Sequence, residues 1–204
     1  MGNLESEVKF LLGGQTAVRD RLLALGAVLQ KERVFERNVR FDTPDEQLLQ
    51  RWELLRLRQD TAVRITFKAP TAADAGSQVK VMEELEVGVS DFATMAAIFR
   101  RLGFVETQVY EKWRETFALG GVEAVVDELP YGDFIELEGA EADIFAVAHQ
   151  LGLDWERRIV TNYLQLMGGL KQFHQLDFDD ITFANFEQCG ARVVDLPGYD
   201  FADE

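Results

Sequence analysis

The chain has 204 residues, of which 36 are acidic and 21 are basic, giving a formal net charge of −15. This acidic balance argues against a nucleic acid or an anionic membrane as partner, because both require a basic face on the protein. The single cysteine, Cys189, excludes an intrachain disulfide framework and a cysteine-cluster metal site.

A chain of this length is expected to form one domain, or one domain with an appendage. Its start, MGNLESEVKF, carries Glu5 and Glu7 where a secretory signal needs a basic end and an apolar stretch. No apolar run approaches the roughly 18 residues that a membrane-spanning helix needs. We therefore expect a cytoplasmic protein.

In chain order, the sequence alternates between period-two strands and amphipathic helices. Helices are predicted over 15–25, over 91–102 and in the stretch that ends at Leu151-Gly152. Strands with charged residues at alternate positions are predicted at 5–9, 54–58, 63–68, 84–88, 109–114 and 134–138. Loops are predicted at 70–77, 120–121 and 130–132. About eight strands with three helices between them predict an α+β fold with a mostly antiparallel sheet.

A threefold repeat connects these elements. ESEVK, ELEVG and ELEGA each carry Glu-x-Glu, and each is followed by a helical segment that ends in Leu-Gly. After each Leu-Gly comes an aromatic residue, a glutamate and a base, at 35–37, 110–112 and 155–157.

The charges on the strands are segregated by sign. Carboxylates recur as pairs two residues apart, and bases recur as pairs two or four residues apart: Glu5 and Glu7, Arg56 and Arg58, Arg64 and Lys68, Glu84 and Glu86, Lys112 and Arg114, Glu136 and Glu138. Helices on the outside of a curved sheet would leave these charged faces pointing inward.

An eight-stranded closed sheet has room inside for side chains or for one small ligand. A wall of bases requires a polyanion, and paired carboxylates, about 7 Å apart at positions i and i+2 of a strand, require cations. Mg²⁺ prefers oxygen ligands and shares its coordination between carboxylates and phosphates. The pattern therefore predicts a tunnel that binds a metal-bound polyphosphate.

The last part of the chain differs in composition. Residues 177–204 contain eight acids and one base, Arg192, but also apolar residues such as Phe178, Phe183 and Phe186. We interpret 1–170 as the tunnel domain and 171–204 as an acidic extension that packs on it or forms a lid.

Over residues 3 to about 168, the sequence resembles the CYTH domains, also called triphosphate tunnel metalloenzymes. The resemblance lies in an ordered series of motifs: Glu5-Ser6-Glu7-Val8-Lys9, Phe41-Asp42-Thr43-Pro44, Leu55-Arg56-Leu57-Arg58, Thr66-Phe67-Lys68, Glu84-Leu85-Glu86, Lys112-Trp113-Arg114, Asp127, Gly132 to Glu138, and Asn162 to Leu166. Three features depart from the family pattern. Arg40 stands where an aromatic residue is usual, Asn162 replaces a serine, and the tail has no counterpart.

The resemblance implies an antiparallel eight-stranded tunnel with a charged lining. It implies that the triphosphate is held by Lys9, Arg56, Arg58, Lys68, Lys112 and Arg114. It implies that Mg²⁺ or Mn²⁺ is held by Glu5, Glu7, Asp127, Glu136 and Glu138. Glu84 and Glu86 would lie across the tunnel and, with Lys9, act as catalytic residues. Arg64 and Lys80 share the inward parity but match no family position.

The predicted function is metal-dependent hydrolysis of tripolyphosphate or of a small organic triphosphate such as thiamine triphosphate. The first alternative is a class IV adenylate cyclase, which converts ATP to cyclic AMP and pyrophosphate in the same kind of tunnel. An alternative of another class is a non-catalytic polyphosphate sensor. The expected partner is a small-molecule triphosphate, and the expected assembly is a monomer or homodimer.

Other residues are interpreted as structural. His149 and His174 have no ligand spacing, and Trp52, Trp113 and Trp155 are assigned to packing.

Overall fold

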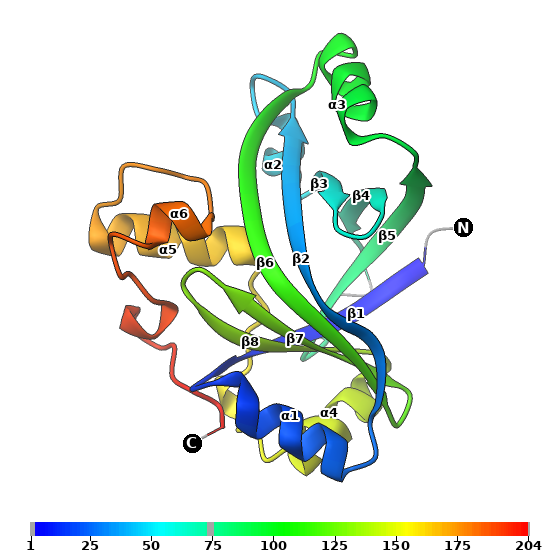
Figure 1. Cartoon of the computed structure of the whole chain (residues 1–204), viewed down its shortest axis with the longest axis vertical. Helices are drawn as coiled ribbons and strands as arrows, with labels where there is room; N and C mark the ends of the chain where they lie inside the picture. The colour runs from blue at the N-terminus through cyan, green and yellow to red at the C-terminus, as the bar shows by residue number, and fades with distance from the viewer. Residues whose placement is uncertain (1–2, 73–75, 204) are drawn as a thin grey trace.

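The computed structural model describes residues 3–72 and 76–203, and Figure 1 shows how its elements are arranged. The strands are β1 (Asn3–Leu12), β2 (Val28–Asp42), β3 (Leu54–Gln59), β4 (Val63–Pro70), β5 (Lys80–Val89), β6 (Val105–Leu119), β7 (Val122–Leu129) and β8 (Gly132–Glu138). The helices are α1 (Gln15–Ala24), α2 (Gln47–Gln50), α3 (Phe92–Arg101), α4 (Glu141–Gln150), α5 (Tyr163–His174) and α6 (Phe183–Phe186), with 3₁₀ turns η2 (Trp155–Arg157) and η3 (Val193–Asp195).

The strands form a closed antiparallel barrel in the order β1-β5-β4-β3-β2-β6-β7-β8. The pairing of β8 with β1 closes the ring, and the long strands β2 and β6 run side by side through the centre of Figure 1. In this ring β2 is four strands from β1 in either direction, so the two strands face each other across the lumen. The predicted α+β class, with an eight-stranded barrel and helices outside it, is confirmed.

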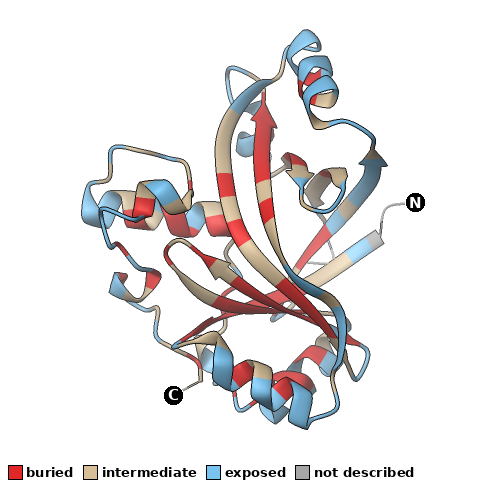
Figure 2. Ribbon diagram, viewed as in Figure 1, coloured by how far each residue is buried: buried red, intermediate tan, exposed pale blue. Residues whose placement is uncertain are grey.

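The apolar residues of the strands point outward and form the core beneath the helices. On β1, Val8, Phe10 and Leu12 are buried against α1 and α4, which contribute Leu22 and Ile144 to the same cluster. Figure 2 shows the buried faces of α1 and α4 turned toward the strands above them. A second cluster lies between α3 and the strands β2 and β3, and a third lies under α5. This outward packing leaves the alternate, charged residues for the lumen.

The helices predicted over 15–25 and 91–102 and before Gly152 correspond to α1, α3 and α4. The first two copies of the repeat are real units: β1, α1, β2, β3 and β4 recur as β5, α3, β6, β7 and β8, with α2 added in the first unit. The third copy stops early, because its triplet at 155–157 forms a 3₁₀ turn. Helix α5 was not predicted, and the predicted loop at 70–77 includes residues 73–75, which lie outside the described residues.

The segment after α5 packs along the outside of the barrel. Ile181, fully buried, accepts a hydrogen bond from Glu111 N–H and donates to Val109 C=O, both at 2.8 Å. Further along, Val193 N–H donates to Tyr131 C=O, and Ala202 N–H donates to Leu11 C=O. The predicted boundary after residue 170 falls inside α5.

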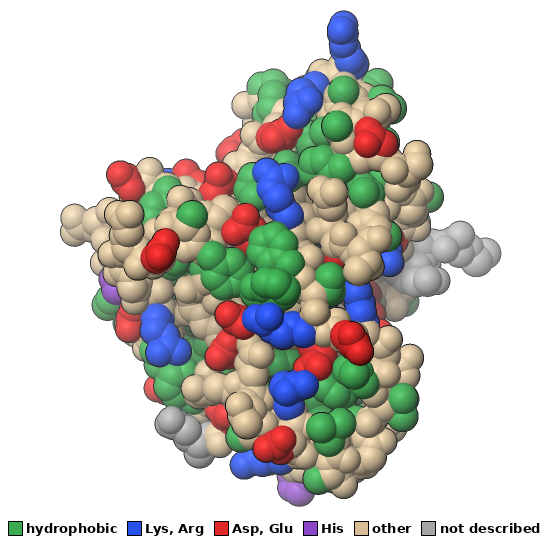
Figure 3. Space-filling view, viewed as in Figure 1, with side chains coloured by type: hydrophobic (Ala, Val, Ile, Leu, Met, Phe, Trp, Pro, Cys, Tyr) green, Lys and Arg blue, Asp and Glu red, His purple; other side chains and the backbone are tan. Residues whose placement is uncertain are grey.

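On the face shown in Figure 3, acidic and basic side chains are interspersed with apolar ones. Across the described residues, the helices are too short or too polar to cross a membrane.

Candidate active site

A cavity of about 900 Å³ occupies the barrel and opens beside α2 and α5. Twelve of the thirteen predicted site residues line it: Glu5, Glu7, Lys9, Arg56, Arg58, Lys68, Glu84, Glu86, Lys112, Arg114, Glu136 and Glu138. They come from six strands that are distant in sequence. The thirteenth, Asp127, is fully buried and is the strand-register partner of Arg114.

The floor of the cavity is formed by alternating carboxylates and ammonium groups on β1 and β8. Lys9 Nζ lies 2.9 Å from Glu7 and 3.3 Å from Glu136, and all three side chains are buried. Burial alone would lower the pKa of Lys9, but these two carboxylates raise it above its usual range. Burial would likewise raise the pKa of Glu7, yet Lys9 and Lys80 hold it well below its usual range. Burial would also raise the pKa of Glu136, but Lys9 and Arg114 lower it, so all three groups stay charged.

The negative charges of Glu5 and Glu138 are less fully neutralised by neighbouring cations. Burial and the charge of Glu5 raise the pKa of Glu138 to about 8, and among the described residues Glu138 forms no ion pair. Burial, with the charges of Glu7 and Glu84, raises the pKa of Glu5 to about 7, although Lys68 opposes the shift. Among the described residues Glu138 has no ion-pair partner and Glu5 pairs with Lys68, so a divalent cation beside them would supply the positive charge that Glu138 lacks.

The donor set consists of carboxylate oxygens, which fits Mg²⁺ or Mn²⁺. Within residues 3–72 and 76–203, no three acidic or imidazole side chains are grouped closely enough to bind one ion by themselves. An ion at Glu5 and Glu138 would therefore need further ligands from water or from a bound phosphate, as Mg²⁺ sites commonly have.

Asp127, on β7, organises the basic wall. Its carboxylate is fully buried and accepts hydrogen bonds from Lys112 Nζ at 2.9 Å, Arg114 Nε at 2.7 Å and Tyr163 Oη at 3.1 Å. Both of its oxygens are occupied, so the geometry fits a residue that positions Lys112 and Arg114 better than it fits a metal ligand. The predicted Asp127 metal role finds no support in this arrangement.

The strands β3, β4 and β5 form the opposite part of the basic wall. Lys68 Nζ binds Glu5 and lies 2.7 Å from Glu84, while Arg58 lies 3.2 Å from Glu86. Glu84 and Glu86 thus hold the bases, as expected. The prediction that they lie across the tunnel from the other glutamates is wrong, because β5 is hydrogen-bonded directly to β1.

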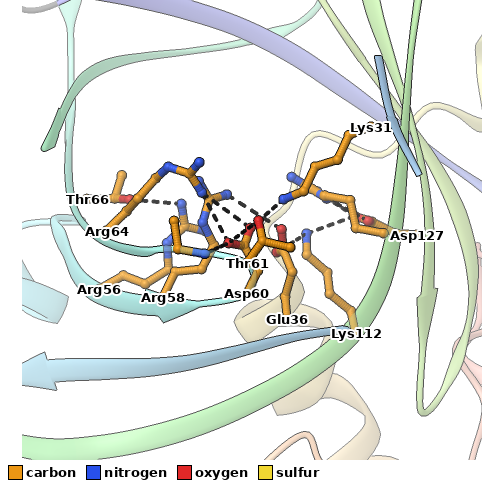
Figure 4. Close-up of polar contacts among 12 residues, drawn as sticks. Lys31, Glu36, Arg56, Arg58, Asp60, Thr61, Arg64, Thr66, Lys112 and Asp127 are labelled. Atoms are coloured by element: carbon orange, nitrogen blue, oxygen red, sulfur yellow. Dashed lines mark hydrogen bonds and ion pairs between the residues drawn. The ribbon is translucent and has the colours of Figure 1, made fainter. Parts of the chain in front are cut away.

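Strand β2 contributes a row of lumen residues that the sequence analysis did not assign. Glu36 and Asn38 are fully buried and Arg40 is 6% exposed. Figure 4 shows Glu36 pointing between Lys112 and the arginines of β3; its oxygens lie 3.9 Å from Lys112 Nζ and 3.7 Å from Arg58 Nη1. The period-two pattern of a strand could have predicted these lumen residues, because positions 36, 38 and 40 share one face of the strand.

Two other inward residues have defined partners. Lys80 lines the cavity and lies 3.0 Å from Glu7. Arg64 binds Asp60 in the β3–β4 turn, together with Lys31 (Figure 4). Burial would raise the pKa of Asp60, but hydrogen bonds from Lys31 and from Ala62 N–H lower it to about 2.

The three tryptophans differ from one another. Trp113 packs against Phe35, and Trp155 packs against Phe10 and Phe145, as predicted. Trp52 does not pack in a core: it is 66% exposed and lines the cavity mouth.

Comparisons with known proteins agree with this geometry. The CYTH domain model matches residues 3–152. A protein of Methanocaldococcus jannaschii named "Putative adenylate cyclase" is 29% identical over 177 residues, which cover 81% of this chain and 99% of that protein.

Among solved structures, a Vibrio parahaemolyticus protein with the same description has a TM-score of 0.73 at 19% identity, covering 82% of this chain and 99% of that one. A Pyrococcus horikoshii protein has a TM-score of 0.67 at 26% identity, covering 79% and 98%. A Hippeastrum protein, described as a "Putative adenylyl cyclase" with a dominant triphosphatase activity, has a TM-score of 0.50 at 17% identity, covering 72% and 88%.

Proposed function

The chain belongs to the CYTH domain family, and from this premise we propose that it is a metal-dependent triphosphatase that hydrolyses tripolyphosphate or a small organic triphosphate. The observation that carries the proposal is the convergence, in one closed lumen, of a buried basic wall and a carboxylate pair, Glu5 and Glu138, of which Glu138 has no ion-pair partner among the described residues. Some of these bases and carboxylates pair with one another, as Lys68 does with Glu5, and a metal-bound polyphosphate would use both sets.

The basic wall would bind and orient the phosphate chain. Asp127 fixes Arg114 and Lys112, and Glu86 and Glu84 fix Arg58 and Lys68. Cations held in this way need little reorganisation when charge develops on the phosphoryl oxygens, which is the main protein contribution to phosphoryl transfer.

Glu5 and Glu138 would hold the Mg²⁺ or Mn²⁺ ion, with Glu7 and Glu136 beside them. The bound ion would supply charge neutralisation at the phosphate oxygens and a polarised water molecule. Lys9, placed between Glu7 and Glu136, would keep these two carboxylates oriented and donate to a phosphate oxygen.

The second candidate is cyclisation of ATP. Exposed apolar residues at the cavity mouth, Leu49 and Trp52 among them, offer a surface for a nucleoside, and the archaeal relative carries a cyclase name. Hydrolysis ranks first because water needs no further positioning group, whereas cyclisation requires the ribose hydroxyl to be held in line. A non-catalytic sensor ranks last, because binding alone does not require the carboxylate pair.

The test is a substrate panel of tripolyphosphate, thiamine triphosphate and ATP, each with Mg²⁺ and with Mn²⁺, with phosphate, pyrophosphate and cyclic AMP measured together. Metal-dependent phosphate release supports the proposal. Pyrophosphate formed in equal amount with cyclic AMP would establish the cyclase instead. Binding of these anions without turnover would establish the sensor.

A further inference from the structure

Two buried guanidinium groups lie directly opposite each other on neighbouring strands of the lumen. Arg40 on β2 and Arg56 on β3 are register partners, and both line the cavity. They are 6% and 9% exposed. Like charges directly opposite each other in a sheet are destabilising, and more so when they are shielded from water.

The partners that these arginines have do not neutralise them both. Among the residues that the structure describes, Arg56 donates hydrogen bonds to the neutral hydroxyls of Tyr110 and Thr66, at 3.0 and 3.1 Å, and to no carboxylate. Arg40 Nη2 lies 3.2 Å from Asp42. Within the described residues, the Nε–H groups of both arginines are buried without an acceptor.

Asp42 is itself already engaged. Its carboxylate accepts hydrogen bonds from the backbone N–H groups of Thr43 at 2.7 Å, Leu48 at 2.9 Å and Leu49 at 3.0 Å. This carboxylate therefore serves to anchor α2 to the barrel, and it leaves most of the Arg40 donors available.

The rest of the β2 row indicates where an anion would lie. Along β2 the lumen residues change from negative at Glu36 to neutral at Asn38 to positive at Arg40. The side-chain nitrogen and oxygen of buried Asn38 have no hydrogen-bond partner among the described residues. An anion is thus favoured at the Arg40 end, with Asn38 Nδ2 as an additional donor.

This end of the cavity is the open one. Leu49 and Trp52, which line it, are 43% and 66% exposed. Of the nearby lining carboxylates, Glu53 and Asp179 bind Arg51 and Lys171, and Glu46 is exposed. The β2 row also lies on the side of the ring opposite β1, which carries Glu5 and Glu7.

We infer that Arg40 and Asn38 extend the phosphate-binding wall at Arg56 into an anion clamp for a phosphoryl group beyond the three of a triphosphate, so that the chain prefers linear phosphates of four or more units. The inference rests on the proposed function, because it extends the same phosphate-binding site. A fourth unit would emerge toward the open mouth, away from the carboxylate pair.

The test is calorimetric binding of tripolyphosphate and tetrapolyphosphate without divalent metal, so that binding is measured apart from turnover. We expect the wild-type protein to bind tetrapolyphosphate at least about tenfold more tightly, the size of one charge-assisted contact. Arg40→Gln should abolish this preference, and Arg40→Lys should retain part of it. The control, Arg101→Gln, removes an exposed charge on α3 and should leave the preference intact.

Equal binding of both anions by the wild-type protein would overturn the inference, as would an equal loss for both in Arg40→Gln with an unchanged melting temperature. ATP and adenosine 5′-tetraphosphate repeat the comparison and distinguish a nucleotide source of the fourth unit from an inorganic one. Hydrolysis is measured separately with Mg²⁺. Its absence, with the binding preference present, would count against the proposed function and leave the clamp standing.

Discussion

At the scale of single residues, charges in the lumen differ in how completely they are neutralised. Lys9 has two carboxylate partners and Asp127 has two cationic ones. Glu138 has no ion pair among the described residues, although it is half-buried. Since an uncompensated buried charge is costly, this is the position where a bound cation changes the energy most.

We predict that Glu138→Gln lowers metal-dependent triphosphate turnover by about 10²-fold or more, because a neutral amide is a poor ligand for a hard cation. The melting temperature should not fall, since the substitution removes like-charge repulsion with Glu5. Released phosphate measured against Mg²⁺ concentration checks this. Glu32→Gln, at an exposed position of β2, is the control. Full activity of Glu138→Gln would refute the metal assignment.

At the scale of elements, closure of the barrel decides what the third copy of the repeat becomes. Strand β8 is hydrogen-bonded to the edge of β1, so the sheet has no free edge that another long strand could extend. The segment after α4 pairs with the sheet only through Lys9 and Ile159, and it then continues into α5. A repeat in the sequence therefore predicts a strand only while the sheet has an edge to extend.

The tail offers a stability test at this scale. Ile181 is fully buried against β6, so Ile181→Ala should lower the free energy of unfolding by about 2–5 kcal/mol through lost burial and a residual cavity. Ile98→Ala is the matched control: Ile98 is 44% exposed on α3, and its truncation should cost no more than about 0.5 kcal/mol. Urea unfolding measures both. Equal stabilities would mean that the tail does not contribute to folding of the barrel.

At the scale of the whole molecule, an acidic chain encloses a basic wall. The net charge is −15, yet the cavity gathers Lys9, Arg56, Lys68, Lys112 and Arg114. A polyanion that enters the lumen should therefore stabilise the folded chain in spite of the overall charge.

We predict that tripolyphosphate at about 100 times its dissociation constant adds about 2.7 kcal/mol of stability. For a chain of this size, that raises the melting temperature by about 5–10 °C. Differential scanning fluorimetry measures the shift. The control is sodium chloride at equal ionic strength, and an equal shift with the salt would mean that the lumen does not recognise the phosphate chain.

By itself, the sequence determined the periodicity of the strands, the segregation of their charges and, through the ordered motifs, the barrel and most of its lining. These are local properties, since alternation fixes which residues share a face of a strand whatever its neighbours are. Which strands lie opposite or adjacent is a property of the closed ring, and only the tertiary structure decided it. That is why Glu84 and Glu86 proved to be next to β1, why Asp127, predicted as a metal ligand, binds Lys112 and Arg114, and why Arg40 meets Arg56.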